Sequence, residues 1–257
     1  MKTIFNSEYP VVRMIHLEPL LGKEGFTTID NLLDNAKKDI EALQLGGVDA
    51  IMLENNNDAP YSEYLELPGA ISFGYIACEL SKYISLPLGY TVLANDWLSA
   101  LSLAKLTKAS FIRLDTFVDK VEKVEGGMII DPNPEEIMAF KKKIDVDVDI
   151  WTDVHVKHTE MLEEKSITES INQALDNGSN GIIISGSWTG KETNLDDLKE
   201  AKTATDRKVP VIVGSGINSD NIKLMSEHSD IGIVGSSIKR DGRIDMLKVK
   251  SLMSKVK

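Results

Sequence analysis

The residues best suited to chemistry lie close together in the segment Asp153-Val-His-Val-Lys-His158. Side chains of an extended chain alternate between two sides, so Asp153, His155 and Lys157 would share one side, opposite two valines. A carboxylate, an imidazole that titrates near neutral pH and an ammonium would then face the same volume. The spacing therefore predicts a cluster able to transfer protons or bind a charged ligand.

Three chemistries fit this cluster. In acid–base catalysis, His155 would move a proton while Asp153 orients its ring. A divalent metal would instead be bound by His16, Glu54, Asp153 and His155, a mixed nitrogen and oxygen set that suits Zn²⁺ or Mn²⁺. Lys157 would form a Schiff base if its amine were desolvated. We favour acid–base catalysis without a cofactor, and an ordinary solvated strand end is the alternative to all three.

Two further segments predict an anion site. Val211-Ile-Val-Gly-Ser-Gly-Ile217 and Ile231-Gly-Ile-Val-Gly-Ser-Ser-Ile-Lys239 are apolar runs that end in Gly-Ser turns. Glycines let backbone N–H groups approach an anion, and the N-terminus of a following helix adds partial positive charge. Tight strand-to-helix packing without a ligand is the alternative. The residues expected to bind phosphate are Gly214, Ser215, Gly216, Gly235, Ser236, Ser237 and Lys239.

A recurring unit positions these residues: an amphipathic helix, a turn of small residues and a short strand rich in Ile and Val. Such alternation predicts a parallel sheet buried on both faces. Eight strands in 257 residues indicate an α/β fold, a (β/α)₈ barrel that forms one domain over residues 1–257. A doubly wound open sheet would more often place its glycine-rich turn after the first strand. The expected strands are 11–15, 50–53, 87–92, 111–114, 148–152, 182–184, 211–213 and 231–234.

In such a barrel, catalytic residues lie at the carboxyl ends of the strands. Arg113 stands inside an apolar strand, and its burial is costly unless it pairs with Glu54, with Asp153 or with a bound anion. The residues expected to be catalytic are Glu54, Arg113, Asp153, His155 and Lys157. The residues expected to bind substrate are His16, Asn55, Asn95, Asp115, Ser185, Thr189 and Gly190.

Two long irregular segments follow the second and fourth strands, at 55–69 and 116–134. Loops of this length in a compact domain often cover a binding site. Glu125-Gly-Gly127 would act as a hinge in the second loop, whose alternating charges fit a solvated insertion equally well.

Composition excludes several partners. A net charge of −11 argues against nucleic acid and anionic membranes, which both bind basic surfaces. No apolar run approaches the roughly 20 residues of a transmembrane helix, and the first residues lack the apolar core of a signal peptide. The single cysteine, Cys78, fits a reducing cytoplasm. We expect a cytoplasmic protein with a phosphorylated small-molecule partner; a homo-oligomer stays open because barrels of this type often pair.

Several motifs together resemble the BtpA family, which includes SgcQ-like proteins. The resemblance implies a phosphate-binding barrel of the ribulose-phosphate-binding type. It also implies two kinds of role, since the cyanobacterial member is described as a photosystem I biogenesis factor and SgcQ-like members look like sugar-phosphate enzymes. The motifs are Met14-Ile-His-Leu-Glu-Pro19, Gly46-Gly-Val-Asp-Ala50, Glu54-Asn55, Asp58-Ala-Pro60, Asn95-Asp96, Phe111-Ile-Arg113, Asp153-Val-His-Val-Lys-His158, Val213-Gly-Ser-Gly216 and Ile233-Val-Gly-Ser-Ser-Ile-Lys-Arg-Asp-Gly242.

Together these features predict an enzyme of the isomerase, epimerase or lyase type that acts on a phosphorylated sugar or related metabolite. A non-enzymatic assembly or stabilisation factor is one alternative. A metal-dependent hydrolase of nucleoside or sugar phosphates is another.

Overall fold

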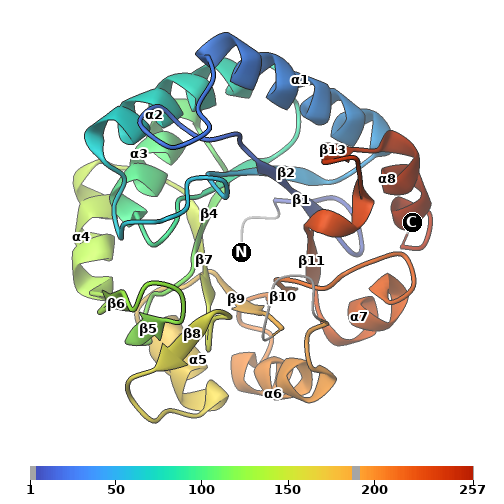
Figure 1. Ribbon diagram of the computed structural model, residues 1–257. Coiled ribbons are helices and arrows are strands. Elements are labelled where there is room, and N and C mark those ends of the chain that lie inside the picture. Colours follow the sequence, from blue (N-terminus) through green and yellow to red (C-terminus); the bar gives the residue numbers. More distant parts are fainter. Residues whose placement is uncertain (1–3, 187–191, 257) are drawn as a thin grey trace.

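The computed structural model describes residues 4–186 and 192–256, and within them eight parallel strands close into a barrel (Figure 1). The closed ring has the order β1-β11-β10-β9-β7-β4-β3-β2, and each strand is hydrogen-bonded to the strand on either side of it. The predicted (β/α)₈ fold and its eight strands are confirmed. The barrel strands are β1 (Val11–His16), β2 (Ala50–Glu54), β3 (Leu88–Thr91), β4 (Phe111–Leu114), β7 (Asp149–Asp153), β9 (Gly181–Ile184), β10 (Val211–Val213) and β11 (Ile231–Val234).

The α-helices form a ring outside the strands (Figure 1). Side chains that begin the helices often satisfy the first free N–H groups: Thr28 accepts from Asn31, and Ser166 and Glu169 form a capping box. The helices are α1 (Ile29–Gly46), α2 (Leu67–Ser81), α3 (Trp97–Thr107), α4 (Pro134–Lys143), α5 (Ile167–Asp176), α6 (Leu195–Thr205), α7 (Ile222–His228) and α8 (Met246–Met253). Among the described residues, no helix has the length and apolar character needed to span a membrane.

Large side chains fill the inside of the barrel. The rings of Phe111 and Trp151 stack with their centroids 4.0 Å apart. Gly89 makes room for them, because a Cβ there would lie 2.1 Å from the Phe111 ring. Phe5 packs against the same cluster from the N-terminal segment, with its ring centroid 6.2 Å from that of Trp151. The interior is therefore a packed core, and the polar strand ends are gathered at the carboxyl end.

The charged segment after β4 is an ordered part of the fold. Its strand β5 (Val121–Lys123) pairs with β6 (Ile129–Ile130) and with β8 (Thr159–Met161), which follows β7. This three-stranded antiparallel sheet joins the two loops. Asp119 is buried and accepts hydrogen bonds from Ser170 Oγ at 2.6 Å and from the backbone N–H of His155 at 3.0 Å. The interpretation of this segment as a solvated insertion was therefore wrong, because its Asp119 side chain is buried and hydrogen-bonded to neighbouring elements.

Candidate functional site

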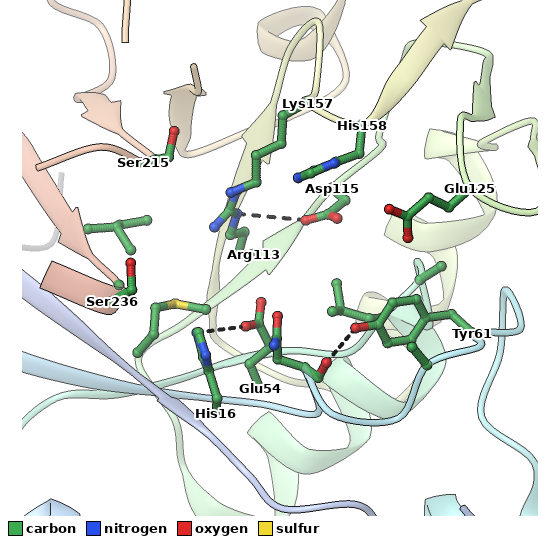
Figure 2. Close-up of a pocket in the computed structure, with 18 of the residues that line it drawn as sticks. His16, Glu54, Tyr61, Arg113, Asp115, Glu125, Lys157, His158, Ser215 and Ser236 are labelled. Atoms are coloured by element: carbon green, nitrogen blue, oxygen red, sulfur yellow. Dashed lines mark hydrogen bonds and ion pairs between the residues drawn. The ribbon is translucent and has the colours of Figure 1, made fainter. Parts of the chain in front are cut away.

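A cavity of about 810 Å³ lies at the carboxyl end of the barrel (Figure 2). The ends of β1, β2, β4, β10 and β11 contribute to its wall. The two long loops also line it, through Tyr61 and its neighbours after β2 and through Lys123, Glu125 and Met128 around the β5–β6 turn. Both loops therefore lie where binding loops were predicted; a hinge at Glu125-Gly-Gly127 stays a prediction.

The two Gly-Ser turns form one wall of this cavity. The six turn residues of the predicted phosphate site all line it, and the 3₁₀ helix η1 (Ser236–Ile238) begins immediately after the second turn. Gly214 is needed for packing, because a Cβ there would lie 2.5 Å from both Ile183 Cγ2 and Ser185 Oγ. At Gly235 nothing lies within 4 Å of the corresponding position. Close packing thus accounts for Gly214 but not for Gly235.

Hydrogen bonds of the turn serines tie the first turn to the segment after β9 and the second turn to the first. Ser215 Oγ accepts from the N–H of Gly186 at 2.8 Å, and Ser237 Oγ donates to the carbonyl of Ile217 at 2.9 Å. Ser236 is exposed, and its side chain makes no hydrogen bond within the described residues. Its hydroxyl is therefore available to a ligand.

Beside the turns, three side chains form a chain of contacts. Lys239 Nζ lies 3.5 Å from His16 Nδ1, and His16 Nε2 lies 3.2 Å from Glu54 Oε2. Lys239 Nζ can only donate, so His16 Nδ1 accepts. The ring proton of His16 is therefore on Nε2, directed at Glu54. Burial, reinforced by the charge of Lys239, lowers the pKa of His16 to about 3, so the ring is neutral. Burial raises the pKa of Glu54 to about 7, so this carboxyl can accept or donate a proton near neutral pH.

A charged wall is built around Arg113, which is almost fully buried, lines the cavity and has Nη2 3.5 Å from the Cβ position of Gly214. Its Nε and Nη2 donate to Asp153 Oδ2 and Oδ1 at 2.7 and 2.9 Å, and Ser185 Oγ donates to the same Oδ1 at 2.7 Å. The ion pair with Asp153 is one of the two pairings predicted for Arg113. Burial alone would lower the pKa of Arg113, but the carboxylates of Asp153 and Asp115 raise it, so the guanidinium keeps its charge.

The structure does not bring His155 into this cavity. The chain leaves the extended conformation after Asp153, and His155 has a left-handed φ of 48°. Its N–H is bound by Asp119, and its Nε2 is buried without a hydrogen-bond partner in the described part of the chain. The expected alternation of Asp153, His155 and Lys157 on one side was wrong, because the turn bound by Asp119 replaces a longer strand. Asp153 therefore orients Arg113 and not an imidazole.

The alternative metal site is not assembled either. Asp153 is bound at both oxygens by Arg113, and His155 is not among the residues lining the cavity. Within residues 4–186 and 192–256, no three His, Cys, Asp or Glu side chains group as metal ligands.

The β7 loop does deliver Lys157 and His158 to the cavity (Figure 2). Burial, followed by the charge of Arg113, lowers the pKa of Lys157. Asp115 lies nearby, with Oδ1 3.8 Å from Arg113 Nε and Oδ2 3.5 Å from Lys123 Nζ. Two carboxylates and three cationic side chains therefore lie close together beside the loops that line the cavity. They are Asp115, Asp153, Arg113, Lys123 and Lys157.

Other predicted residues support the site without lining it. Asn55 Oδ1 accepts from Leu93 N–H at 2.8 Å, and Asn95 Oδ1 accepts from Thr116 N–H at 3.2 Å. Short amide side chains at strand ends thus satisfy loop backbone groups, as buried polar groups generally must. Ser185 acts through Asp153. Thr189 and Gly190 lie outside the described residues.

Sequence reasoning missed three residues near the cavity. Arg13 is buried and donates from Nη1 to the carbonyl of Val234, the residue before the second glycine turn. A charge inside an apolar strand, the signal that singled out Arg113, applied to Arg13 as well. Tyr61 and Lys123 carried no such signal, because long loops bring them to the cavity.

Solved structures with this fold include N-(5'-phosphoribosyl)anthranilate isomerase from Pyrococcus furiosus. That structure has a TM-score of 0.57 at 14% sequence identity, covering 96% of this chain and 98% of that chain. A structure described as native KDPGal has a TM-score of 0.58 at 14% identity, covering 98% of this chain and 96% of its own. At such identities the likeness shows the barrel fold alone.

Sequence relatives are much more similar. An uncharacterized protein of Methanocaldococcus jannaschii is 35% identical over 252 residues, with 95% of this chain and 94% of that protein covered. The photosystem I biogenesis protein BtpA of Synechocystis is 34% identical over 244 residues, with 94% of this chain and 84% of that protein covered. The family model described as "BtpA family" matches residues 7–257. The chain therefore belongs to the BtpA family.

Proposed function

We propose that the protein is an enzyme that converts a phosphorylated sugar or related small metabolite. The observation that carries the proposal is one cavity with two different walls: the glycine turns, and a charged wall with Arg113 and Lys157, with Glu54 between the two. Barrels of this architecture frequently bind phosphate at the loops after their last two strands and a short extra helix. The turns after β10 and β11 and the helix η1 occupy those positions.

The phosphate would bind the backbone N–H groups of the two turns, with the hydroxyl of Ser236 as a further donor. Lys239 and the buried Arg13 add positive charge next to these turns, against the negative charge of the whole protein. Local donors of this kind decide where an anion binds even on an acidic protein.

The substrate's reacting end would then lie against the charged wall. Glu54 would transfer protons, with His16 holding its carboxyl in place. Arg113, held rigid by Asp153, would stabilise negative charge that develops on a substrate oxygen. Isomerisation, epimerisation and retro-aldol cleavage all need such a proton donor or acceptor and such an electrostatic partner.

The name of the Synechocystis relative favours a second candidate, a factor that assists assembly of a protein complex. In that case the cavity would be inherited without use. The two functions differ in whether phosphorylated metabolites bind at the turns.

Thermal-shift measurements against paired phosphorylated and unphosphorylated sugars test the proposal. A ligand at 100 times its Kd stabilises a protein by about 2.7 kcal/mol, which is easily measured. Ser236→Asp places a carboxylate at the turn and should abolish the shift, whereas Ser251→Asp adds the same charge on the exposed side of α8 and should preserve it. If no phosphorylated compound shifts the Tm, or if both variants lose the shift alike, the enzyme proposal fails and the assembly role is favoured.

A further inference from the structure

Lys157 differs from the other lysines near the cavity in its contacts. Lys123 is paired with Asp115 at 3.5 Å, and Lys239 contacts His16. Lys157 is in no ion pair or hydrogen bond within the described residues, although it lines the cavity and is mostly buried. Figure 2 shows its side chain directed toward Arg113 and Asp115. Its ammonium is therefore largely withdrawn from bulk water without a direct counterion among the described residues.

Two of the three carboxylates that act on Lys157 are paired with other cations, and the third, Glu54, contacts the neutral His16. Asp153 is bound at both oxygens by Arg113, and Asp115 lies between Arg113 and Lys123. Burial and the fixed charge of Arg113 both favour the neutral amine and lower the pKa of Lys157. A neutral lysine amine in a desolvated site is a nucleophile toward carbonyl carbons.

We propose that Lys157 forms a Schiff base with the carbonyl carbon of the substrate, which makes the substrate class open-chain sugar phosphates with an aldehyde or ketone group. This inference rests on the proposed function, because the phosphate at the glycine turns would direct the carbonyl end of the substrate toward the charged wall. It selects carbonyl compounds from the wider class of phosphorylated metabolites.

The chemical step balances without an oxidant or reductant. The amine lone pair attacks the carbonyl carbon, the C–N bond forms, and the carbonyl electron pair moves to oxygen, which takes a proton. A second proton transfer to this oxygen releases it as water, and the nitrogen loses one proton to leave an iminium ion. Glu54 faces the same volume and interacts electrostatically with Lys157, so its carboxyl can donate to the departing oxygen.

The iminium explains why one site suits either isomerisation or cleavage. It withdraws electrons from the adjacent carbon, so loss of a proton and cleavage of a C–C bond there are both assisted. Arg113 cannot replace the amine, because a guanidinium stays protonated in proteins.

Borohydride trapping of the full-length protein tests the inference. Glyceraldehyde 3-phosphate and dihydroxyacetone phosphate serve as probes; sodium borohydride reduces any iminium to a stable amine, and peptide mass spectrometry locates it. We expect one saturable adduct on Lys157 that inorganic phosphate suppresses. Lys157→Arg should lower labelling at least tenfold, whereas Lys142→Arg, on the exposed surface of α4, should label like the natural protein.

A parallel thermal shift with the same probes separates this inference from the proposed function. Stabilisation without an adduct on Lys157 overturns the Schiff base and leaves sugar-phosphate binding intact. Neither stabilisation nor an adduct overturns both. Labelling spread over lysines according to their exposure, or undiminished in a folded Lys157→Arg protein, also overturns the Schiff base. Peptide mapping of the unaltered protein decides the outcome even if the variant does not fold.

Discussion

The two walls of the cavity differ in what they are made of. The turns after β10 and β11 present main-chain groups and short serine side chains, and the six turn residues predicted from sequence all line the cavity. The charged wall after β4 and β7 is built from side chains whose roles depend on distant partners. There Asp153 is bound by Arg113, and His155 lies outside the cavity wall.

This difference shows which kind of site a strand pattern can locate. A glycine turn at the end of a strand keeps its backbone geometry wherever the strand is placed. The role of a carboxylate, by contrast, depends on which cation lies nearest to it in the folded structure. Asp153 and Asp115 are both aspartates at strand ends, yet the first is bound by Arg113 and Ser185 and the second faces the cavity.

The largest expected effect comes from removing the carboxylate that holds the charged wall. Asp153→Asn leaves the buried Arg113 guanidinium with only its longer ion pair to Asp115, at 3.8 Å, which should cost about 3–5 kcal/mol of the free energy of unfolding. Chemical denaturation measures the loss. Asp131→Asn breaks an exposed ion pair with Lys120 and should cost less than about 1 kcal/mol. Equal losses of unfolding free energy in the two variants would show that the Arg113–Asp153 ion pair does not stabilise the charged wall.

Next comes the pH dependence of Glu54, on the floor between the walls. Its pKa is raised from 4.5 to about 7 in the folded state, so the folded protein favours the protonated carboxyl. The resulting stability is present below pH 4.5 and is lost as pH rises through 7. The shift corresponds to about 3 kcal/mol.

Unfolding free energies between pH 4 and 8 check this expectation. Glu54→Gln has no proton to lose, so its stability relative to the natural protein should rise over that range. A difference that does not change with pH would contradict a raised pKa at Glu54.

A smaller effect is expected in the turn wall. Gly214→Ala forces a Cβ to within 2.5 Å of Ile183 and Ser185, and such overpacking typically costs about 1–3 kcal/mol. Gly74→Ala in α2 is the matched control, since nothing lies within 4 Å of its Cβ position. Alanine in a helix should stabilise the control by about 0.5–1 kcal/mol. Thermal unfolding of both variants tests whether backbone packing shapes the first turn.

The smallest effect is expected at His155. His155→Ala removes a ring that does not line the cavity, so the Tm shift produced by a sugar phosphate should stay within experimental error. Arg113→Lys, in the charged wall, should reduce that shift, because an ammonium cannot keep the two-point contact with Asp153. Loss of ligand binding in His155→Ala would instead support the cluster of Asp153, His155 and Lys157 that the spacing predicts.

The barrel itself was predictable because its pattern is local. Short Ile- and Val-rich runs separated by amphipathic helices placed all eight barrel strands, including Phe111–Leu114 with its bounds. The sheet of β5, β6 and β8 was not predictable in the same way. Its strands have two or three residues, and it forms only because the loop after β4 meets the loop after β7.

By itself, the sequence determined the barrel, the two glycine turns and the gathering of the strands' carboxyl ends at one end of the barrel. These features follow from periodicity and turn chemistry along a few residues. Only the tertiary structure decided that Asp119 turns the chain at His155, that Asp153 is bound by Arg113, and that Lys157 enters the cavity without an ion pair to any described residue. The physical reason is that a charged group takes its role from its neighbours in space. Those neighbours come from strands and loops far apart in the chain.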